Sequence, residues 1–243
     1  MNTSSNGYVL TFAMGLCVVI SSALALTASA LRDKQAAAEE ADRQKNVMLA
    51  AGLIGLDDPR QQSELDDFYR QRVTEHVLEL ATGEIDKVSI EAWKKMRDSE
   101  RAPYRLIAIT RDAAGKDDTF VVPISGPGLW SILFGFLALE SDGNRVRGIT
   151  FYKHGETPGL GGECENPVWT SQWIGKRILD DQGQLRSVTV KKNKVDPAIP
   201  VEKAHFVDGL SGSTITSNGI TNFVKRDLTA YRPFLAKAWA RKG

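Results

Sequence analysis

The stretch Asp208-Gly209-Leu210-Ser211-Gly212-Ser213-Thr214-Ile215-Thr216 is the starting point for interpreting this 243-residue chain. It places two glycines and four hydroxyl side chains directly before an apolar pattern that predicts a helix from near Thr216 towards Trp239. Small residues let a backbone approach a ligand closely, and the N–H groups at a helix start carry a partial positive charge, so together they suit a phosphate. An ordinary capped helix start explains the same residues equally well, because Ser and Thr are favoured caps.

Two other local motifs do not fit this stretch. No Gly-Lys-Ser/Thr follows, so it is not a Walker loop. The segment Gly209-Leu210-Ser211-Gly212-Ser213 lacks the last glycine of a nucleophile elbow, so we expect no catalytic nucleophile here. The residues alone therefore indicate a candidate phosphate site and nothing more specific.

Composition excludes several classes of function. Lys plus Arg is 31 and Asp plus Glu is 30, which leaves a net charge of +1 and no basic excess for nucleic acid. Cys17 lies in an apolar run and Cys164 in a polar one, so we expect neither a disulfide nor an iron–sulfur cluster. The three histidines are scattered without metal-ligand spacing, so no metal site is expected: His76, His154 and His205.

A long uncharged run near the start of the chain predicts a membrane anchor. Gly7 to Leu31 contains no charged side chain, and about 25 residues at 1.5 Å each span roughly 37 Å of helix, enough to cross a bilayer. A cleaved signal peptide is the alternative, since Ala28-Ser29-Ala30 resembles a cleavage site. The first six residues carry no Lys or Arg and the run is long, so we expect a retained anchor that covers residues 1–33.

The remaining pattern predicts an α+β architecture behind this single transmembrane helix. Residues 34–100 are expected to form a helical neck, with one helix ending near Gly55 and a second over Ser63 to Thr82. Residues 101–243 are expected to form one mixed α/β domain. Its predicted elements are strands at 104–110, 119–124, 129–139, 145–153 and 185–191, and a short helix at 169–178.

A second informative stretch is Glu156-Thr157-Pro158-Gly159-Leu160-Gly161-Gly162-Glu163. One proline and three glycines in this short segment force a loop that a ligand can approach closely. Leu160 stands between glycines, where it is poorly placed to join a core and could pack against a planar ring. A surface loop with an incidental leucine explains the composition alone.

The first stretch resembles the flavinylation motif of the C subunit of the sodium-translocating NADH:quinone reductases, and of the related G subunit of Rnf electron-transport complexes. The resemblance implies that Thr214 holds FMN through a phosphoester bond, with Ser211, Gly212, Ser213 and Thr216 around the cofactor. Ser213 stands where many relatives have Ala. Aligning the motif assigns the acceptor to Thr214 rather than to the neighbouring hydroxyls of Ser211 and Thr216.

Two further segments are similar to motifs of the same family, in the family's order. The Glu-Thr-Pro-Gly-Leu-Gly segment implies a leucine on a face of the isoalloxazine and polar groups near its edge; the residues concerned are Glu156, Thr157, Gly159, Leu160 and Gly161. The segment Gly126-Pro127-Gly128-Leu129-Trp130-Ser131 implies that Trp130 and Ser131 border the flavin. Lys191 could offset the charge of the phosphate or of the flavin edge, or it is one more charge in a basic run. The Trp130 segment and residues 45–53 favour the sodium-translocating reductase over Rnf.

The resemblance implies a membrane-anchored flavoprotein subunit that relays electrons from NADH towards ubiquinone while the complex exports sodium ions. The implied partners are the A, B, D, E and F subunits of a six-subunit complex, a separate flavin transferase that installs FMN from FAD, and membrane lipid. Without a Rossmann fingerprint, the chain is not expected to oxidise NADH alone. The different-class alternative is a non-redox, membrane-tethered binding or assembly protein whose loop merely caps a helix.

Topology is the one point on which charge and resemblance disagree. Arg32, Lys34, Arg43 and Lys45 follow the span and nothing basic precedes it, so the positive-inside tendency places the C-terminal domain in the cytoplasm. The family resemblance implies a bacterial inner-membrane protein with its FMN domain on the periplasmic side. We take the family orientation as the expectation.

Overall fold

The computed structural model describes residues 6–112 and 114–240. The first five residues of the predicted anchor, and residues 113 and 241–243 of the predicted domain, lie outside the described residues. The chain divides into two compact units, Met1–Asp42 and Arg43–Gly243. The described part of the first unit belongs to helix α1 (Asn6–Ala50), which contains an 18-residue window of mean hydropathy 2.3 with no buried residue. In the described part of the chain, this is the one helix long and apolar enough to cross a membrane.

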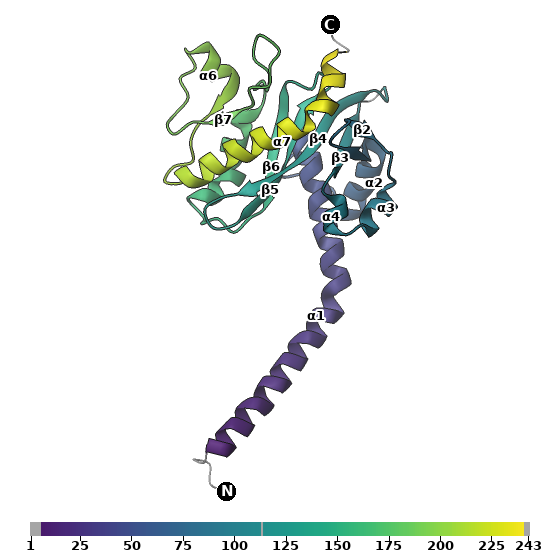
Figure 1. The fold of residues 1–243 in the computed structure, drawn as a ribbon, viewed down its shortest axis with the longest axis vertical. Helices are drawn as coiled ribbons and strands as arrows, with labels where there is room; N and C mark the ends of the chain where they lie inside the picture. The colour runs from purple at the N-terminus through teal and green to yellow at the C-terminus, as the bar shows by residue number, and fades with distance from the viewer. Residues whose placement is uncertain (1–5, 113, 241–243) are drawn as a thin grey trace. The chain divides into compact units, whose positions relative to one another are not determined.

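An antiparallel six-stranded sheet organises the second unit (Figure 1). Its strand order is β2-β1-β3-β4-β5-β6, and every neighbouring pair is antiparallel. The strands are β1 (Val73–Glu79), β2 (Glu84–Ile85), β3 (Tyr104–Arg111), β4 (Asp117–Pro127), β5 (Ile132–Glu140) and β6 (Val146–Lys153). The strands predicted over 104–110, 119–124 and 145–153 are therefore confirmed. The strand predicted over 129–139 begins only at Ile132, because residues 129–131 form the turn between β4 and β5.

Both faces of the sheet are buried. Successive side chains of a strand point to opposite faces, and two neighbouring residues of β4 belong to different core clusters. Val121 packs in a cluster with Met48 at the end of α1 and with Tyr69 of helix α2 (Gln62–Arg72). The next residue, Val122, packs in the other cluster with Phe223 of helix α7 (Thr214–Ala240). Two-sided burial explains why the central strands read as almost continuous apolar runs rather than as alternating ones.

Helix α7 lies across the sheet and approaches β4 closely (Figure 1). A β-carbon at Gly126 would lie 2.3 Å from Phe223 Cβ, and one at Gly219 would lie 2.2 Å from the carbonyl oxygen of Pro127. These glycines therefore set the start of α7 against the end of β4. The buried residues of α7 recur at helical spacing: Thr216, Ser217, Ile220, Phe223, Val224, Leu228, Tyr231, Leu235 and Ala238.

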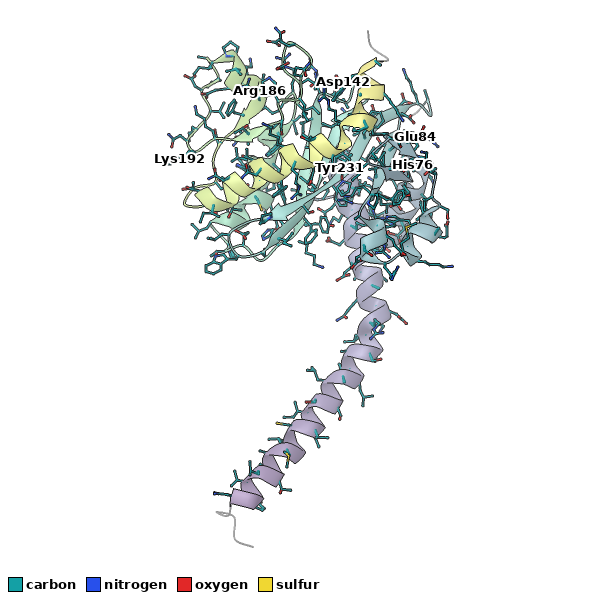
Figure 2. The ribbon with its side chains drawn as sticks, in the orientation of Figure 1. His76, Glu84, Asp142, Arg186, Lys192 and Tyr231 are labelled. Carbon is teal, nitrogen blue, oxygen red and sulfur yellow. The ribbon has the colours of Figure 1, made fainter. Side chains whose placement is uncertain are left out.

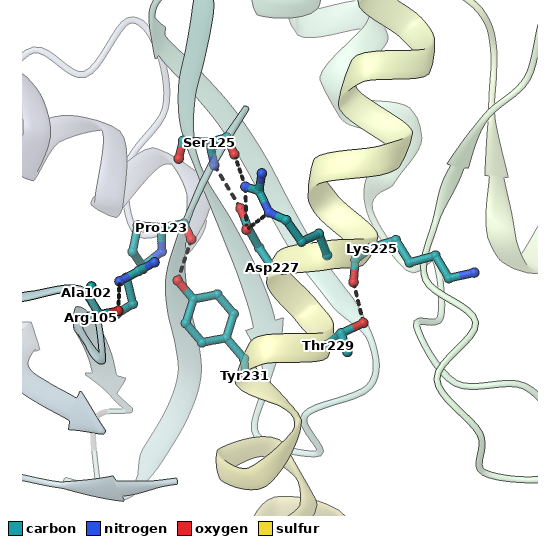
Figure 3. Close-up of polar contacts among 9 residues, drawn as sticks. Ala102, Arg105, Pro123, Ser125, Lys225, Asp227, Thr229 and Tyr231 are labelled. Atoms are coloured by element: carbon teal, nitrogen blue, oxygen red, sulfur yellow. Dashed lines mark hydrogen bonds and ion pairs between the residues drawn. The ribbon is translucent and has the colours of Figure 1, made fainter. Parts of the chain in front are cut away.

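Side chains of α7 also satisfy the edge of β4 (Figure 3). β4 pairs with β3 only over residues 117–121, so the part of β4 that follows Val121 has no strand partner on that side. Tyr231 donates its hydroxyl to Pro123 O at 2.7 Å, and Asp227 Oδ2 accepts from Ser125 N at 3.0 Å. Arg226 donates to the carbonyl of Ser125. The helix thus provides the hydrogen bonds that a neighbouring strand would otherwise supply.

The helix predicted over Ser63 to Thr82 is wrong in its second half. Helix α2 ends at Arg72, and the chain continues directly as β1, whose seven residues all pair with β3. The apolar spacing of this segment suits a helix, but pairing with a distant strand decided the outcome. Residues 34–100 consequently contribute two strands, β1 and β2, to the sheet in addition to helices α2, α3 (Ile90–Lys95) and α4 (Asp98–Arg101).

Two smaller elements also differ from expectation. Of the strand predicted over 185–191, only Thr189–Val190 forms a strand, β7, which is parallel to β8 (Phe206–Val207). Leu185 makes an isolated antiparallel bridge with Leu179. The helix predicted over 169–178 is instead two short helices, α5 (Pro167–Thr170) and the 3-10 helix η2 (Ser171–Trp173). Gly175, at φ +79°, has a backbone conformation that does not continue a right-handed helix. The remaining elements are the 3-10 helix η1 (Gly161–Glu165) and α6 (Pro200–His205).

Candidate functional site

Three segments meet at the carboxylate of Glu156: the β4–β5 turn, the loop between β6 and η1, and the start of α7. Glu156 Oε1 accepts from the backbone N–H of Trp130 at 2.9 Å and of Ser131 at 3.2 Å. Glu156 Oε2 accepts from Leu129 N at 3.2 Å and from the hydroxyl of Thr216 at 2.6 Å. Glu156 is only 5% exposed. The three segments recognised in the sequence are therefore one connected site.

Two glycines make room for this carboxylate. A β-carbon at Gly128 would lie 2.6 Å from Glu156 Oε1, and one at Gly161 would lie 2.6 Å from Oε2 and 2.9 Å from Thr216 Oγ1. These distances are shorter than ordinary van der Waals contact. Glycine is needed at both positions because a side chain would occupy the space of the hydrogen-bonded oxygens.

Glu156 is held in its ionised form. Burial acts to raise its pKa, but the hydroxyl of Thr216 and the backbone N–H groups of Trp130, Leu129 and Ser131 stabilise the anion and bring the pKa below its ordinary value. In the described residues, no Lys, Arg or His side chain forms an ion pair with Glu156. The charge is therefore stabilised by neutral donors alone.

The four hydroxyl residues of the Ser/Thr-rich loop fall into two groups. Ser213 and Thr216 are buried, and Ser213 Oγ donates to Thr216 Oγ1 at 2.8 Å in a chain that ends on Glu156. Ser211 and Thr214 are exposed. Thr214 is the first residue of α7, two positions earlier than the predicted start near Thr216. Its hydroxyl is accessible where the free N–H groups of the helix start also lie.

The loop before Thr214 is fixed at its beginning by Asp208. The main chain of Asp208 accepts from Trp169 Nε1 at 2.8 Å and donates to Gln172 Oε1 at 2.9 Å. Its carboxylate accepts from Val195 N at 2.7 Å. Asp208 stands first in the sequence motif, which is the signal that could have identified it. Only the structure gives it a role, which is to anchor the loop to α5 and η2.

Exposed apolar side chains lie beside this loop. Trp130 is 71% exposed and Leu160 is 43% exposed. A β-carbon at Gly212, which has φ +68°, would lie 2.8 Å from Leu160 Cδ2, so Leu160 covers the loop just before Ser213. The carbonyl of Thr157 accepts from Leu160 N at 3.1 Å, which holds Leu160 outward. The expectation that Leu160 stays out of the core is confirmed.

Other predicted site residues have varied surroundings. Thr157 and Gly159 are exposed, and Ser131 Oγ accepts from Gly155 N at 2.6 Å, which ties the turn to the neighbouring loop. The Lys191 ammonium forms an ion pair with Glu202 at 2.5 Å.

The main chain of Lys191 does lie next to the loop. A β-carbon at Gly209 would be 2.3 Å from the carbonyl oxygen of Lys191. Figure 2 places the following Lys192 at the outer edge of the lobe that carries α6 and β7.

No site role was expected for His154 from the sequence, but the structure shows that it contacts the site. Its Nδ1 accepts from Glu156 N at 3.1 Å, and its Nε2 lies 2.7 Å from Glu165 Oε1. These contacts require the tautomer with a proton on Nε2, because Nδ1 must be an acceptor. Its position two residues before Glu156 was the signal in the sequence that could have identified it. His154 therefore fixes the main chain that carries the Glu156 carboxylate.

Among the described residues, neither a metal cluster nor the Cys164 thiol supports catalysis near the site. No group of three or more His, Cys, Asp or Glu side chains there is arranged to hold a metal ion. Cys164 is buried, and burial raises the pKa of its thiol to about 12. A thiol with so high a pKa is a poor nucleophile at neutral pH.

Comparison with known proteins agrees with this geometry. A family described as FMN-binding domain matches residues 128–229, which include all three segments of the site. The chain is 38% identical to the C subunit of the Na(+)-translocating NADH-quinone reductase of Yersinia pestis, over 97% of this chain and 94% of that protein. It is 36% identical to the C subunit of the Pseudomonas aeruginosa reductase, over 92% and 91% respectively.

Solved structures show the same fold. The crystal structure of Shewanella oneidensis NqrC matches with a TM-score of 0.72 and 28% identity, covering 84% of this chain and 99% of that one. The corresponding C subunit from Parabacteroides distasonis matches with a TM-score of 0.69 at 28% identity, covering 84% and 96%. The chain therefore belongs to the family formed by the C subunits of the Na(+)-translocating NADH-quinone reductases, which are subunits of an oxidoreductase complex.

Proposed function

We propose that the chain carries FMN covalently, as a phosphoester of Thr214, and relays electrons from NADH towards ubiquinone within a complex that exports sodium ions. The observation that supports this assignment best is the contrast between hydroxyls. Thr214 is exposed at the first residue of α7, whereas Thr216 is fully buried and hydrogen-bonded to Glu156. An esterified side chain must reach a bulky cofactor outside the core, which Thr214 can do and Thr216 cannot.

The residues present fit an FMN. The phosphate would lie at the N-terminus of a 27-residue helix, whose free N–H groups and dipole favour an anion. Gly212 has a backbone conformation that favours glycine and leaves the loop open, with Leu160 beside it. Exposed Leu160 and Trp130 offer apolar surface for an isoalloxazine ring.

Attachment needs no redox step. The Thr214 oxygen would form a bond to the FMN phosphorus of FAD as the P–O–P linkage breaks, AMP leaves with the bridging oxygen, and the hydroxyl proton passes to a base or to water. A separate flavin transferase would supply this chemistry. Bound FMN supplies one-electron and two-electron transfer, while the protein holds and orients it.

The remaining parts of the proposal concern assembly and topology. We place the chain in a six-subunit complex with the A, B, D, E and F subunits, anchored in the bacterial inner membrane by α1 with the flavin domain in the periplasm. The names of the relatives support membership of the reductase complex. A reporter fused after Gly243 should be active outside the cytoplasm, and a cytoplasmic result would overturn this orientation.

The covalent assignment is tested by flavin fluorescence of the denatured chain on a gel, together with its intact mass. The wild-type band should fluoresce and carry the mass of one esterified FMN. Thr214→Val should abolish both signals, whereas Ser211→Ala and Thr216→Val should retain them. An unmodified wild-type mass from the native host would leave only a membrane-tethered, non-redox domain.

A further inference from the structure

We propose that Glu156 is an ionised positioning residue which fastens the flavin-bearing helix start to the β4–β5 turn and whose unpaired charge lowers the reduction potential of the flavin. The inference rests on the proposed function, since it concerns the environment of a flavin at Thr214. It assigns Glu156 a different place from the family-based expectation, in which its side chain lies at the edge of the ring.

The carboxylate has no free capacity to serve the flavin edge directly. Each oxygen accepts two hydrogen bonds, Oε1 from Trp130 and Ser131 and Oε2 from Leu129 and Thr216. The side chain is also covered by Gly128 and Gly161. Glu156 therefore acts on the site through the segments that it joins.

Only a carboxylate matches this donor set. All four partners donate, so both oxygens must accept. In Glu156→Gln, the amide NH2 group would replace one accepting oxygen. It would then face other donors, either the N–H groups of Trp130 and Ser131 or the Leu129 N–H group and the Thr216 hydroxyl, and could not accept from them. In Glu156→Asp, the side chain is one methylene shorter and cannot reach both the turn and the helix. The two variants therefore separate the charge from the reach of the side chain.

The charge lies close to the proposed attachment point and is weakly screened. Its Thr216 partner is two residues after Thr214, and another partner is the backbone N–H of exposed Trp130. Burial lowers the local dielectric constant, which strengthens the interaction between this anion and an electron added nearby. A fixed negative charge disfavours adding that electron, so the reduction potential falls.

The first measurement is a spectroscopic redox titration of the full-length flavinylated chain in detergent. Glu156→Gln should move the flavin midpoint potential to a more positive value. Glu163→Gln removes one charge from the 3-10 helix η1 that follows this loop, where the partly exposed Glu163 side chain accepts from Asn166 Nδ2, and it should leave the potential unchanged. Glu156→Asp should keep a potential near that of the wild type. Equal potentials in Glu156→Gln and Glu163→Gln would overturn the charge effect.

The second measurement does not need the flavin. In a full-length Thr214→Val chain, Glu156→Gln and Glu156→Asp should each speed amide hydrogen exchange of residues 129–131 by about tenfold or more, because N–H bonds to an anion are lost or weakened. Glu163→Gln should not. Unchanged exchange would overturn the positioning role. A wild-type chain without flavin would instead refute the proposed function, while the exchange result would still decide whether Glu156 joins the segments.

Discussion

Removing the Thr216 hydroxyl should destabilise the domain without removing the flavin. Thr216→Val keeps the shape of the side chain but deletes its 2.6 Å bond to the Glu156 carboxylate and the acceptor for the Ser213 hydroxyl. A hydrogen bond to a charged group contributes about 1.5–3 kcal/mol and a neutral one about 1 kcal/mol, so we expect the free energy of unfolding to fall by about 2.5–4 kcal/mol. With an m-value of about 2 kcal/mol/M, the urea midpoint should fall by about 1–2 M.

The matched control is Thr214→Val, which removes an exposed hydroxyl from the first turn of the same helix. All chains are compared without flavin, from cells that lack the transferase, by urea unfolding followed with tryptophan fluorescence. Thr214→Val should stay within about 0.5 kcal/mol of wild type. When the transferase is present, the labelling pattern should reverse, with flavin lost only in Thr214→Val. A Thr216→Val chain as stable as wild type, or one that folds yet cannot be flavinylated, would refute the reasoning.

Three further predictions concern packing, the sheet edge and pH. Gly161→Ala should lower the free energy of unfolding by about 1–3 kcal/mol, because its methyl group would lie 2.6 Å from a Glu156 oxygen. The control is Gly55→Ala, which has open space around it, and equal unfolding midpoints for the two variants would contradict the packing argument. Tyr231→Phe should cost about 1 kcal/mol in urea unfolding by leaving the β4 carbonyl of Pro123 unpaired, and an unchanged midpoint would show that the bond is worth nothing. Because the folded pKa of Glu156 is lowered from 4.5, its stabilisation is present above that pH and is lost as the pH falls through the folded pKa. Glu156→Gln should therefore lose less stability than wild type on acidification below about pH 4.5, and parallel pH profiles would refute this.

Secondary structure followed from the sequence wherever local pattern and tertiary environment agreed. Most buried apolar residues of α7 recur at helical spacing and pack in one core cluster, so the last helix was predictable. Val73–Glu79 was not, because its apolar spacing also suits a helix and its strand partner Tyr104–Arg111 lies far along the chain. Thr189–Val190 stays short because it pairs with a strand of only two residues.

The sequence also singled out the three segments of the candidate site, since chemical type and order along the chain are local information. Thr214, Leu160 and Trp130 are exposed, as an attachment point and a ring-contacting surface require. The hydrogen bonds that Glu156 accepts could not be predicted from the sequence. Its four donors come from two segments 26 and 60 residues away at Trp130 and Thr216, and backbone N–H groups have no signature in the sequence.

By itself, the amino-acid sequence determined the apolar span, the α+β class and the residues proposed for the flavin site. Only the tertiary structure decided which hydroxyl is accessible and which is buried. That choice depends on Glu156, a buried anion that must take its hydrogen bonds from whichever donors the packing of α7 against β4 brings within reach. Burial and hydrogen-bond partnership are properties of segments that meet in space, so no single segment encodes them.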